Sequence, residues 1–313
     1  MSMLWLALAL ADTCETYGAV EELPSLQAAG LTESSGVAAS RVQPGVFYTH
    51  DDDGPPRLFA FDRTGTLLAT YDVADAEHDD WEDIAAAPCP DKGDCLYIGD
   101  IGDNDEDRAN ISVYVVREPE DAGDKAKLVA RYTAVYPDGP EDAEALLVQP
   151  CSGRIHILTK GTSEGLSTVY RMPFDPGRDV VTLEEVAKVQ IDGPTAEARR
   201  VTGGDWDLDG DRLVLRTGSQ VLEWTTDPEV PNGHWSDPPK VLVGAEGRQG
   251  EGAAFDLDGG VITTSEGAPV PLSMFACEVS PSSHECLFPQ TGGCGCEQGG
   301  ASSWWPAWFA RRR

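Results

Sequence analysis

The sequence predicts an all-β fold, a β-propeller with five blades, and three observations carry this prediction. A short motif, acidic at first and then apolar, recurs five times along the chain. Each recurrence is followed by a turn signal and by short segments rich in β-branched and aromatic residues, which are typical of strands. The 313 residues include 33 glycines and 22 prolines, and no stretch has the apolar period of a helix. Four short antiparallel strands repeated at this spacing are typical of propeller blades.

The five motifs are expected to form the innermost strands of the blades. They are ESSGVAAS (33–40), DWEDIAAAP (80–88), DAEALLVQP (142–150), VTGGDWDLDG (201–210) and QGEGAAFDLDG (249–259). Second strands are expected in PGVFYTH (44–50), GDCLYIGD (93–100), GRIHILTK (153–160), GDRLVLRT (210–217) and GGVITTSEG (259–267). Third strands are expected in RLFAFDRTG (57–65), ISVYVVREP (111–119), STVYRMPF (167–174), QVLEWTT (220–226) and LSMFACEV (272–279). A fourth strand closes four of the units, in LLATYDVA (67–74), KLVARYTAVY (127–136), EEVAKVQI (184–191) and PKVLVG (239–244).

The fifth unit has no clear fourth strand after Cys286, whereas the N-terminal segment 17–23 belongs to no blade. We therefore expect this segment to supply the missing outer strand, which closes the ring and covers an exposed sheet edge. Six blades are the alternative if a long loop contains a degenerate blade.

The two ends divide the chain into a predicted signal peptide (1–11), a β-propeller domain (12–291) and a tail (292–313). Residues 4–11 are apolar and end in an A-x-A site, as in a signal peptide, with a buried first strand as the alternative. The tail has a Gly-Cys spacer (292–296), a short apolar stretch (301–310) and three terminal arginines. It resembles the C-terminal sorting tails of myxobacterial surface proteins, which implies cleavage near the cysteine and attachment to the cell surface. Both apolar stretches are too short to span a bilayer, so we expect no integral membrane span.

The eight cysteines indicate an oxidising compartment. Cys89 and Cys95 flank a short turn, and Cys277 and Cys286 flank another short excursion, so each pair is expected to form a local disulfide. Cys14 and Cys151 are able to pair, but the sequence leaves this open. Metal binding by the cysteines is the weaker alternative, because no C-x-x-C pair is present. The sequence therefore predicts a protein secreted by a bacterium or held on its outer surface.

The composition is that of an acidic globular protein. Asp and Glu number 54 against 23 Lys and Arg, which gives a formal net charge of −31. The hydrophobic fraction of 41% is sufficient for a core and excludes a disordered chain. The acid excess argues against nucleic acid and anionic membranes as partners, because both would repel this surface. We expect a monomer that binds a small molecule or a protein.

Several motifs resemble those of a group of uncharacterised secreted bacterial propeller proteins. They are WEDIAAAP (81–88), YIGDIGDN (97–104), VREP (116–119), DAEALL (142–147) and QGEGAAF (249–255). The resemblance covers nearly the whole mature chain. More loosely, the chain resembles calcium-dependent propeller hydrolases of the gluconolactonase and esterase-like phytase kinds, which usually have six blades. Their active sites are therefore not carried over.

The predicted topology gathers polar residues on one face of the ring. The first strand of each blade lines the channel and the second runs antiparallel to it, so the start of the first and the end of the second share a face. The strand starts carry Glu33, Asp80, Glu82, Asp83, Asp142, Glu144, Thr202, Asp205 and Glu251. The strand ends carry His50, Asp51, Asp100, Asp103, Asn104, Lys160, Arg216, Ser265 and Glu266. The opposite face receives only tight turns.

So many carboxylates around a narrow channel repel one another unless they are compensated, and a hard cation such as Ca²⁺ would compensate them. The densest oxygen cluster lies in the loop 100–105, so we predict Asp100, Asp103 and Asn104 as the calcium ligands. Glu33, Glu82 and Asp205 are candidates to complete the shell. The ligand-binding residues predicted on the same face are Glu33, Asp51, Glu82, Asp83, Glu144, Lys160, Asp205, Arg216, Glu251 and Glu266. In the structural alternative, the acids cap backbone N–H groups of neighbouring blades or pair with basic residues such as Lys160 and Arg216.

Two further signals concern catalysis and calcium. His50 is the only histidine on the polar face, which makes it the candidate general base. The run 205–210 matches the opening of an EF-hand loop, but Arg216 stands where a bidentate Glu is required and strands flank the run. We therefore predict a hairpin turn there.

The favoured hypothesis is an exported propeller whose acidic face binds a cation and, through it, a ligand or partner, with no catalysis required. The alternative is a metal-dependent hydrolase of an ester, lactone or phosphate at the same face. A third hypothesis, glycoside hydrolysis by paired carboxylates, requires two acids about 5 to 9.5 Å apart.

Overall fold

The computed structural model describes residues 14, 16–119, 125–174, 179–226, 235–242 and 249–278. The predicted signal peptide (1–11), the tail (292–313) and Cys286 lie outside the described residues. Within the described part, no helix has the length and apolar character that a membrane crossing requires.

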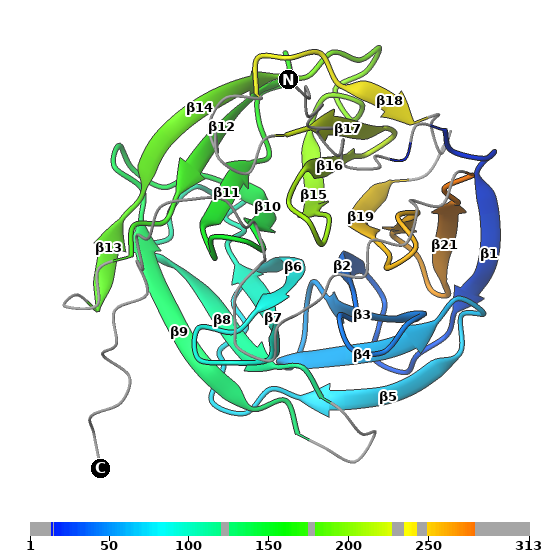
Figure 1. Cartoon of the computed structure of the whole chain (residues 1–313). Coiled ribbons are helices and arrows are strands. Elements are labelled where there is room, and N and C mark those ends of the chain that lie inside the picture. The colour runs from blue at the N-terminus through cyan, green and yellow to red at the C-terminus, as the bar shows by residue number, and fades with distance from the viewer. Residues whose placement is uncertain are drawn as a thin grey trace, which may run out of the picture.

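Five antiparallel sheets stand around a central channel like the blades of a propeller (Figure 1). The first blade contains β2 (Ser34–Ala39), β3 (Val46–Asp51), β4 (Arg57–Asp62) and β5 (Leu67–Asp72). The second contains β6 (Trp81–Pro88), β7 (Asp94–Asp100), β8 (Ile111–Arg117) and β9 (Leu128–Val135). The third contains β10 (Ala143–Val148), β11 (Ile155–Thr159), β12 (Leu166–Arg171) and β14 (Glu184–Gln190). The fourth contains β15 (Val201–Trp206), β16 (Arg212–Thr217), β17 (Val221–Thr225) and β18 (Lys240–Leu242).

The fifth blade joins the two ends of the described chain. It contains β19 (Gly250–Phe255), β20 (Val261–Ser265) and β21 (Val270–Phe275), and β1 (Glu21–Leu26) pairs antiparallel with β21 as its outer strand. The predicted closure of a five-bladed ring by an N-terminal strand is thus confirmed, although the strand begins four residues later than the predicted segment 17–23. Tyr17 adds an isolated bridge to Cys277 on the same side.

Small residues allow the inner strands to approach one another around the channel. A Cβ atom on Gly36 of β2 would lie 2.5 Å from Oδ1 of Asp83 on β6. A Cβ atom on Gly252 of β19 would lie 2.6 Å from the backbone nitrogen of Val37. Side chains larger than hydrogen would therefore force the first blade away from both neighbours. This explains why the recurring motif is small as well as apolar.

The hydrophobic core lies between the blades. Trp81 is fully buried between the first two blades and packs with Tyr48 and Tyr114, which are also fully buried. The short strand β13 (Val180–Thr182), which lies between β12 and β14 in the chain, pairs in parallel with β9 of the second blade. This pairing links two blades at the rim.

Two disulfides lie within the described residues, and one differs from the prediction. Cys89 bonds to Cys95 across the turn, as predicted. Cys277 bonds to Cys14 and not to Cys286, so the predicted local pair is wrong. The physical reason is ring closure, which brings the N-terminal segment alongside the end of β21. The same bond excludes a Cys14–Cys151 pair. Disulfides of this kind are typical of proteins that fold in an oxidising compartment.

Candidate functional site

Each of the five inner strands has a β-bulge near the same end of the channel. The register with the second strand shifts between Ser34 and Val37, and at the corresponding place in the other four blades. A bulge adds a residue that the ladder leaves unpaired and re-aims its side chain. The side chains at or beside these bulges are Ser35, Glu82, Glu144, Thr202 and Glu251, and all five line one cavity.

This cavity has a volume of about 310 Å³ and is strongly acidic. Besides the five bulge residues, it is lined by Glu33, Ser34, Asp52, Asn104, Lys160, Glu197, Arg200, Gly218, Gln249 and Glu266. The ring of bulges and the ends of the second strands thus meet at one mouth of the channel. Of the residues predicted at the inner-strand starts, five line this cavity: Glu33, Glu82, Glu144, Thr202 and Glu251.

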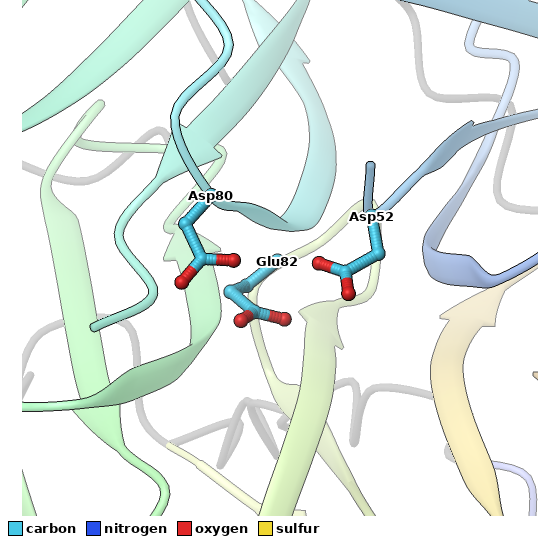
Figure 2. A group of neighbouring side chains, drawn as sticks. All are labelled: Asp52, Asp80 and Glu82. Atoms are coloured by element: carbon cyan, nitrogen blue, oxygen red, sulfur yellow. The ribbon is translucent and has the colours of Figure 1, made fainter. Parts of the chain in front are cut away.

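Three carboxylates, two of which line the cavity, lie close enough to share a cation. The side chains of Asp52, Asp80 and Glu82 each offer one oxygen, and these oxygens lie within 4.8 Å of one another. Figure 2 shows Asp52 and Asp80 on either side of Glu82. Glu82 also belongs to a second such group, with Asp142 and Glu144. We call these the first and the second carboxylate group.

Burial and mutual repulsion raise the pKa values of all three acids in the first carboxylate group. Burial, followed by repulsion from Asp80, raises the pKa of Asp52 to about 7. Burial and repulsion from Glu144 raise the pKa of Glu82 well above its usual range. The pKa of Asp80 is raised by burial, although Arg108 partly opposes this. A divalent cation would relieve this repulsion with the oxygen ligands that it prefers.

The second carboxylate group already contacts a positive charge. The ammonium of Lys160 contacts Oε1 of Glu144 and lies 3.4 Å from Oδ2 of Asp142. Burial alone would lower the pKa of Lys160, but Glu144 and Asp142 raise it above its ordinary value. Lys160 therefore stays charged at neutral pH.

The loop 100–105, which was predicted to supply the calcium ligands, packs against the first carboxylate group. Oδ1 of Asp100 accepts hydrogen bonds from the backbone N–H of Asp80 at 3.1 Å and from Nη2 of Arg108 at 2.6 Å. Asp103 accepts the backbone N–H groups of Asp107 and Arg108 at 2.9 and 2.8 Å. A Cβ atom on Gly102 would lie 2.3 Å from Oε1 of Glu82, so this glycine packs directly against the group.

Neither Asp100 nor Asp103 belongs to the two carboxylate groups, and their role as metal ligands stays a prediction. Their carboxylates are engaged by Arg108 and by backbone N–H groups. Asn104 does line the cavity, but its Oδ1 accepts a hydrogen bond from Lys160 at 3.4 Å.

Three of the predicted ligand-binding acids hold backbone groups instead. Asp83 is fully buried and accepts N–H groups of Ile84, Leu146 and Gly204, on three different blades. Asp205 accepts the N–H of Phe255 from the next blade at 3.1 Å. Asp51 accepts the N–H groups of Thr32 and Glu33 at 2.7 and 2.8 Å. The capping alternative thus describes Asp83 and Asp205, whereas Asp51 holds N–H groups that directly precede β2 of its own blade.

His50 and Arg216 do not reach the cavity. His50 is fully buried with its ring 5.8 Å from that of Trp81, and burial lowers its pKa to about 3. Arg216 is fully buried against Gly250 and donates from Nη1 to the backbone oxygen of Gln220 at 3.1 Å. Burial lowers the pKa of Arg216 to about 10.

The remaining predicted residues do line the cavity: Glu33, Glu82, Glu144, Lys160, Glu251 and Glu266. Burial and repulsion from Glu144 and Glu266 raise the pKa of Glu251 to about 9, so this carboxyl group is protonated at neutral pH. The run 205–210 is a hairpin turn, as predicted, in which Asp207 accepts the N–H groups of Asp211 and Arg212.

Asp52 is the residue of the first group that the sequence analysis did not single out. It follows β3 directly after Asp51, so its place at a strand end was the available signal. Which of the two neighbouring aspartates faces the cavity depends on the local backbone, and the sequence does not specify this.

Comparisons with known proteins identify structural neighbours but no family. No family model matches the chain, and no curated protein matches its sequence. The PQQ-bound aldose sugar dehydrogenase of Streptomyces coelicolor is similar with a TM-score of 0.48 and 11% identity, over 82% of this chain and 98% of that one. The apo soluble aldose sugar dehydrogenase of Escherichia coli has a TM-score of 0.48 and 13% identity, over 84% and 100%.

A gluconolactonase of Xanthomonas campestris has a TM-score of 0.44 and 14% identity, over 83% of this chain and 98% of that one. A gluconolactonase is thus among the neighbours, as the looser sequence resemblance implies. At these identities and TM-scores, the neighbours decide nothing about the chemistry of this chain.

Proposed function

We propose that this protein is an exported binding propeller. It holds a divalent cation, calcium, in the first carboxylate group, and a small molecule or protein ligand binds at the cavity above it. The observation that carries the proposal is the arrangement of Asp52 and Glu82, which line the cavity, with Asp80 beside them. Their oxygens lie within 4.8 Å of one another, and among the described residues none of the three has an ion pair with a basic side chain.

Oxygen donors of this kind suit calcium, which takes six to eight oxygen ligands in flexible geometry. Three carboxylates leave several coordination positions for water or for ligand oxygens. The Oδ1 atom of Asp52 is buried and has no hydrogen-bond partner among the described residues, which suits an atom that coordinates a cation. A ligand in the cavity would reach the cation directly.

The test is the thermal stability of the chelator-treated protein in a calcium titration. At a calcium concentration 100 times Kd, we expect Tm to rise by about 5–10 °C. Glu82→Gln should abolish most of this rise. Asp72→Asn is the matched control, because this exposed carboxylate lies in the first blade and pairs with Arg57. An unresponsive wild type, or an equal rise in Glu82→Gln, would refute the proposal. Magnesium should give a smaller rise, because it requires stricter octahedral geometry.

A metal-assisted hydrolase of an ester, lactone or phosphate is the second candidate function. The observation that favours it is Glu251, whose protonated carboxyl group lines the cavity and is suited to protonate a leaving group. Turnover of one of these substrates that is lost in Glu251→Gln while calcium binding persists would assign this role. Absence of turnover across all three classes leaves the binding function.

Export to the cell surface or medium is part of the proposal. It is supported by the two disulfides, which reducing compartments disfavour, and by the apolar N-terminal segment 1–11. The mass of the protein recovered from the culture and cell-surface fractions tests cleavage at both ends. Acidic surface charge supports a monomer that avoids nucleic acid.

A further inference from the structure

The two carboxylate groups share Glu82 but differ in counter-charge. In the second group, the ammonium of Lys160 contacts Glu144, lies 3.4 Å from Oδ2 of Asp142 and donates to Oδ1 of Asn104 at 3.4 Å. Three side-chain oxygens thus surround this nitrogen as they would surround a metal ion. The cation of the second group is therefore the ammonium of Lys160, a side chain of the protein itself.

In the part of the chain that the structure describes, no basic side chain forms an ion pair with Asp52, Asp80 or Glu82 of the first group. The positive charge of Arg108 acts on Asp80, but its guanidinium is engaged by other groups. It donates to Oδ1 of Asp100 and to the backbone oxygen of Gly102, both at 2.6 Å. The buried Oδ1 of Asp52 remains without a partner among the described residues. The second carboxylate group thus has a positive charge in contact with its oxygens, and the first does not.

We propose that Lys160 is a tethered cation that fills the second carboxylate group and so limits the channel mouth to one exchangeable divalent ion. This inference rests on the proposed cation site in the first group. Lys160 follows directly after β11, so the sheet fixes the start of its side chain. A dication in the second group would have to displace the ammonium from Glu144 or bind beside it. Both cost electrostatic free energy in a partly buried setting.

Lys160 is therefore a specificity-determining residue. If a second dication bound, Glu82 would bridge the two ions, as carboxylates do in two-metal sites, where the ions lie about 3.5–4 Å apart. The ammonium leaves Glu82 to a single ion and keeps the cavity side of that ion accessible to a ligand.

The experiment is calcium stoichiometry by native mass spectrometry and calorimetry on the oxidised protein. We expect one ion per wild-type chain and two per Lys160→Met chain, because methionine keeps the unbranched shape and most of the length of the side chain without its charge. Lys160→Arg keeps the charge and should bind one ion. Lys160→Gln should behave like Lys160→Met and retains a donor for Glu144, which covers the case in which methionine prevents folding. Adding Glu144→Gln to Lys160→Met should return the count to one.

The outcomes separate this inference from the proposed function. Two ions on the wild type, or one ion on wild type and both neutral variants alike, would overturn the inference while leaving a cation site in place. No ion on the wild type but one on Lys160→Met would refute the proposed function and support the role of Lys160. No ion on any variant would overturn both.

Discussion

The channel carboxylates form two sets that differ in what stabilises them. Asp83 and Asp205 lie among the inner strands, where they accept backbone N–H groups from neighbouring blades. Asp52, Glu82 and Glu251 line the cavity, and among the described residues none of them forms an ion pair with a basic side chain. The deep set connects the blades to one another. The set at the mouth remains available to a ligand.

The contrast is sharpest between Glu82 and Asp83, which are neighbours in sequence. The bulge between Trp81 and Asp83 leaves Glu82 out of the ladder and turns it toward the cavity. Asp83 pairs with Gly99 of β7, and its side chain accepts a hydrogen bond from the backbone N–H of Gly204 in the fourth blade. A single backbone irregularity therefore separates a structural acid from a candidate functional one.

The largest effect is expected from Asp83→Ala. This change leaves three buried N–H groups without an acceptor, on Ile84, Leu146 and Gly204. Each unsatisfied buried group costs about 1–3 kcal/mol, so the loss of three acceptor bonds should lower the free energy of unfolding by about 3–9 kcal/mol. Equilibrium denaturation in urea measures this loss.

Asp205→Ala is the matched comparison, because its side chain accepts one inter-blade N–H, that of Phe255. Its loss should be about 1–3 kcal/mol. If Asp83→Ala cost no more than Asp205→Ala, the deep set would not connect three blades through Asp83.

The sequence specified most of the fold because its signals were local. The repeated motif, the turn residues and the period of two located the inner strands within a few residues of their bounds. The unassigned segment 17–23 and the incomplete fifth unit together predicted the ring closure. The pairing of Cys277 was missed, because Cys14 lies 263 residues away and only the closed ring brings the two together.

The site was predicted less well, because it depends on side-chain direction. Topology placed Glu82, Glu144 and Glu251 at the right face. It did not distinguish Glu82 from Asp83, since bulges have no reliable sequence signal here. It also favoured Asp100 and Asp103 for their density along the chain, whereas Arg108 and nearby N–H groups engage both carboxylates. Local clustering of acids in sequence was thus a poor guide to an open site.

An intermediate effect is expected from pH at the mouth. The pKa of Asp52 is about 7 in the folded protein against an ordinary value of 3.8, so the folded state binds this proton more tightly than the unfolded state. Its contribution to stability is complete below about pH 4 and is lost as pH rises through about 7. Without calcium, wild type should lose about 1–2 kcal/mol relative to Asp52→Asn between pH 5 and 8, after allowance for solvent screening.

Calcium should reverse this trend, because it binds the ionised carboxylate. The calcium-induced rise in Tm of the wild type should increase from pH 5 to pH 8. Asp72→Asn controls for the general repulsion among surface acids. A stability difference between wild type and Asp52→Asn that stays constant across this range would show that Asp52 is not perturbed.

The smallest effect is expected from Asp100→Asn. This change tests whether the cation binds at the mouth or in the loop 100–105. The carboxylate of Asp100 pairs with Arg108 and accepts the N–H of Asp80. Asparagine keeps an acceptor for that N–H and loses only the charge, so the free energy of unfolding should fall by about 1 kcal/mol. Calcium stoichiometry should remain that of the wild type, because Arg108 already neutralises Asp100. If Asp100→Asn abolished calcium binding and Glu82→Gln did not, the cation site would belong to the loop 100–105, and the acids around Glu82 would be the structural set.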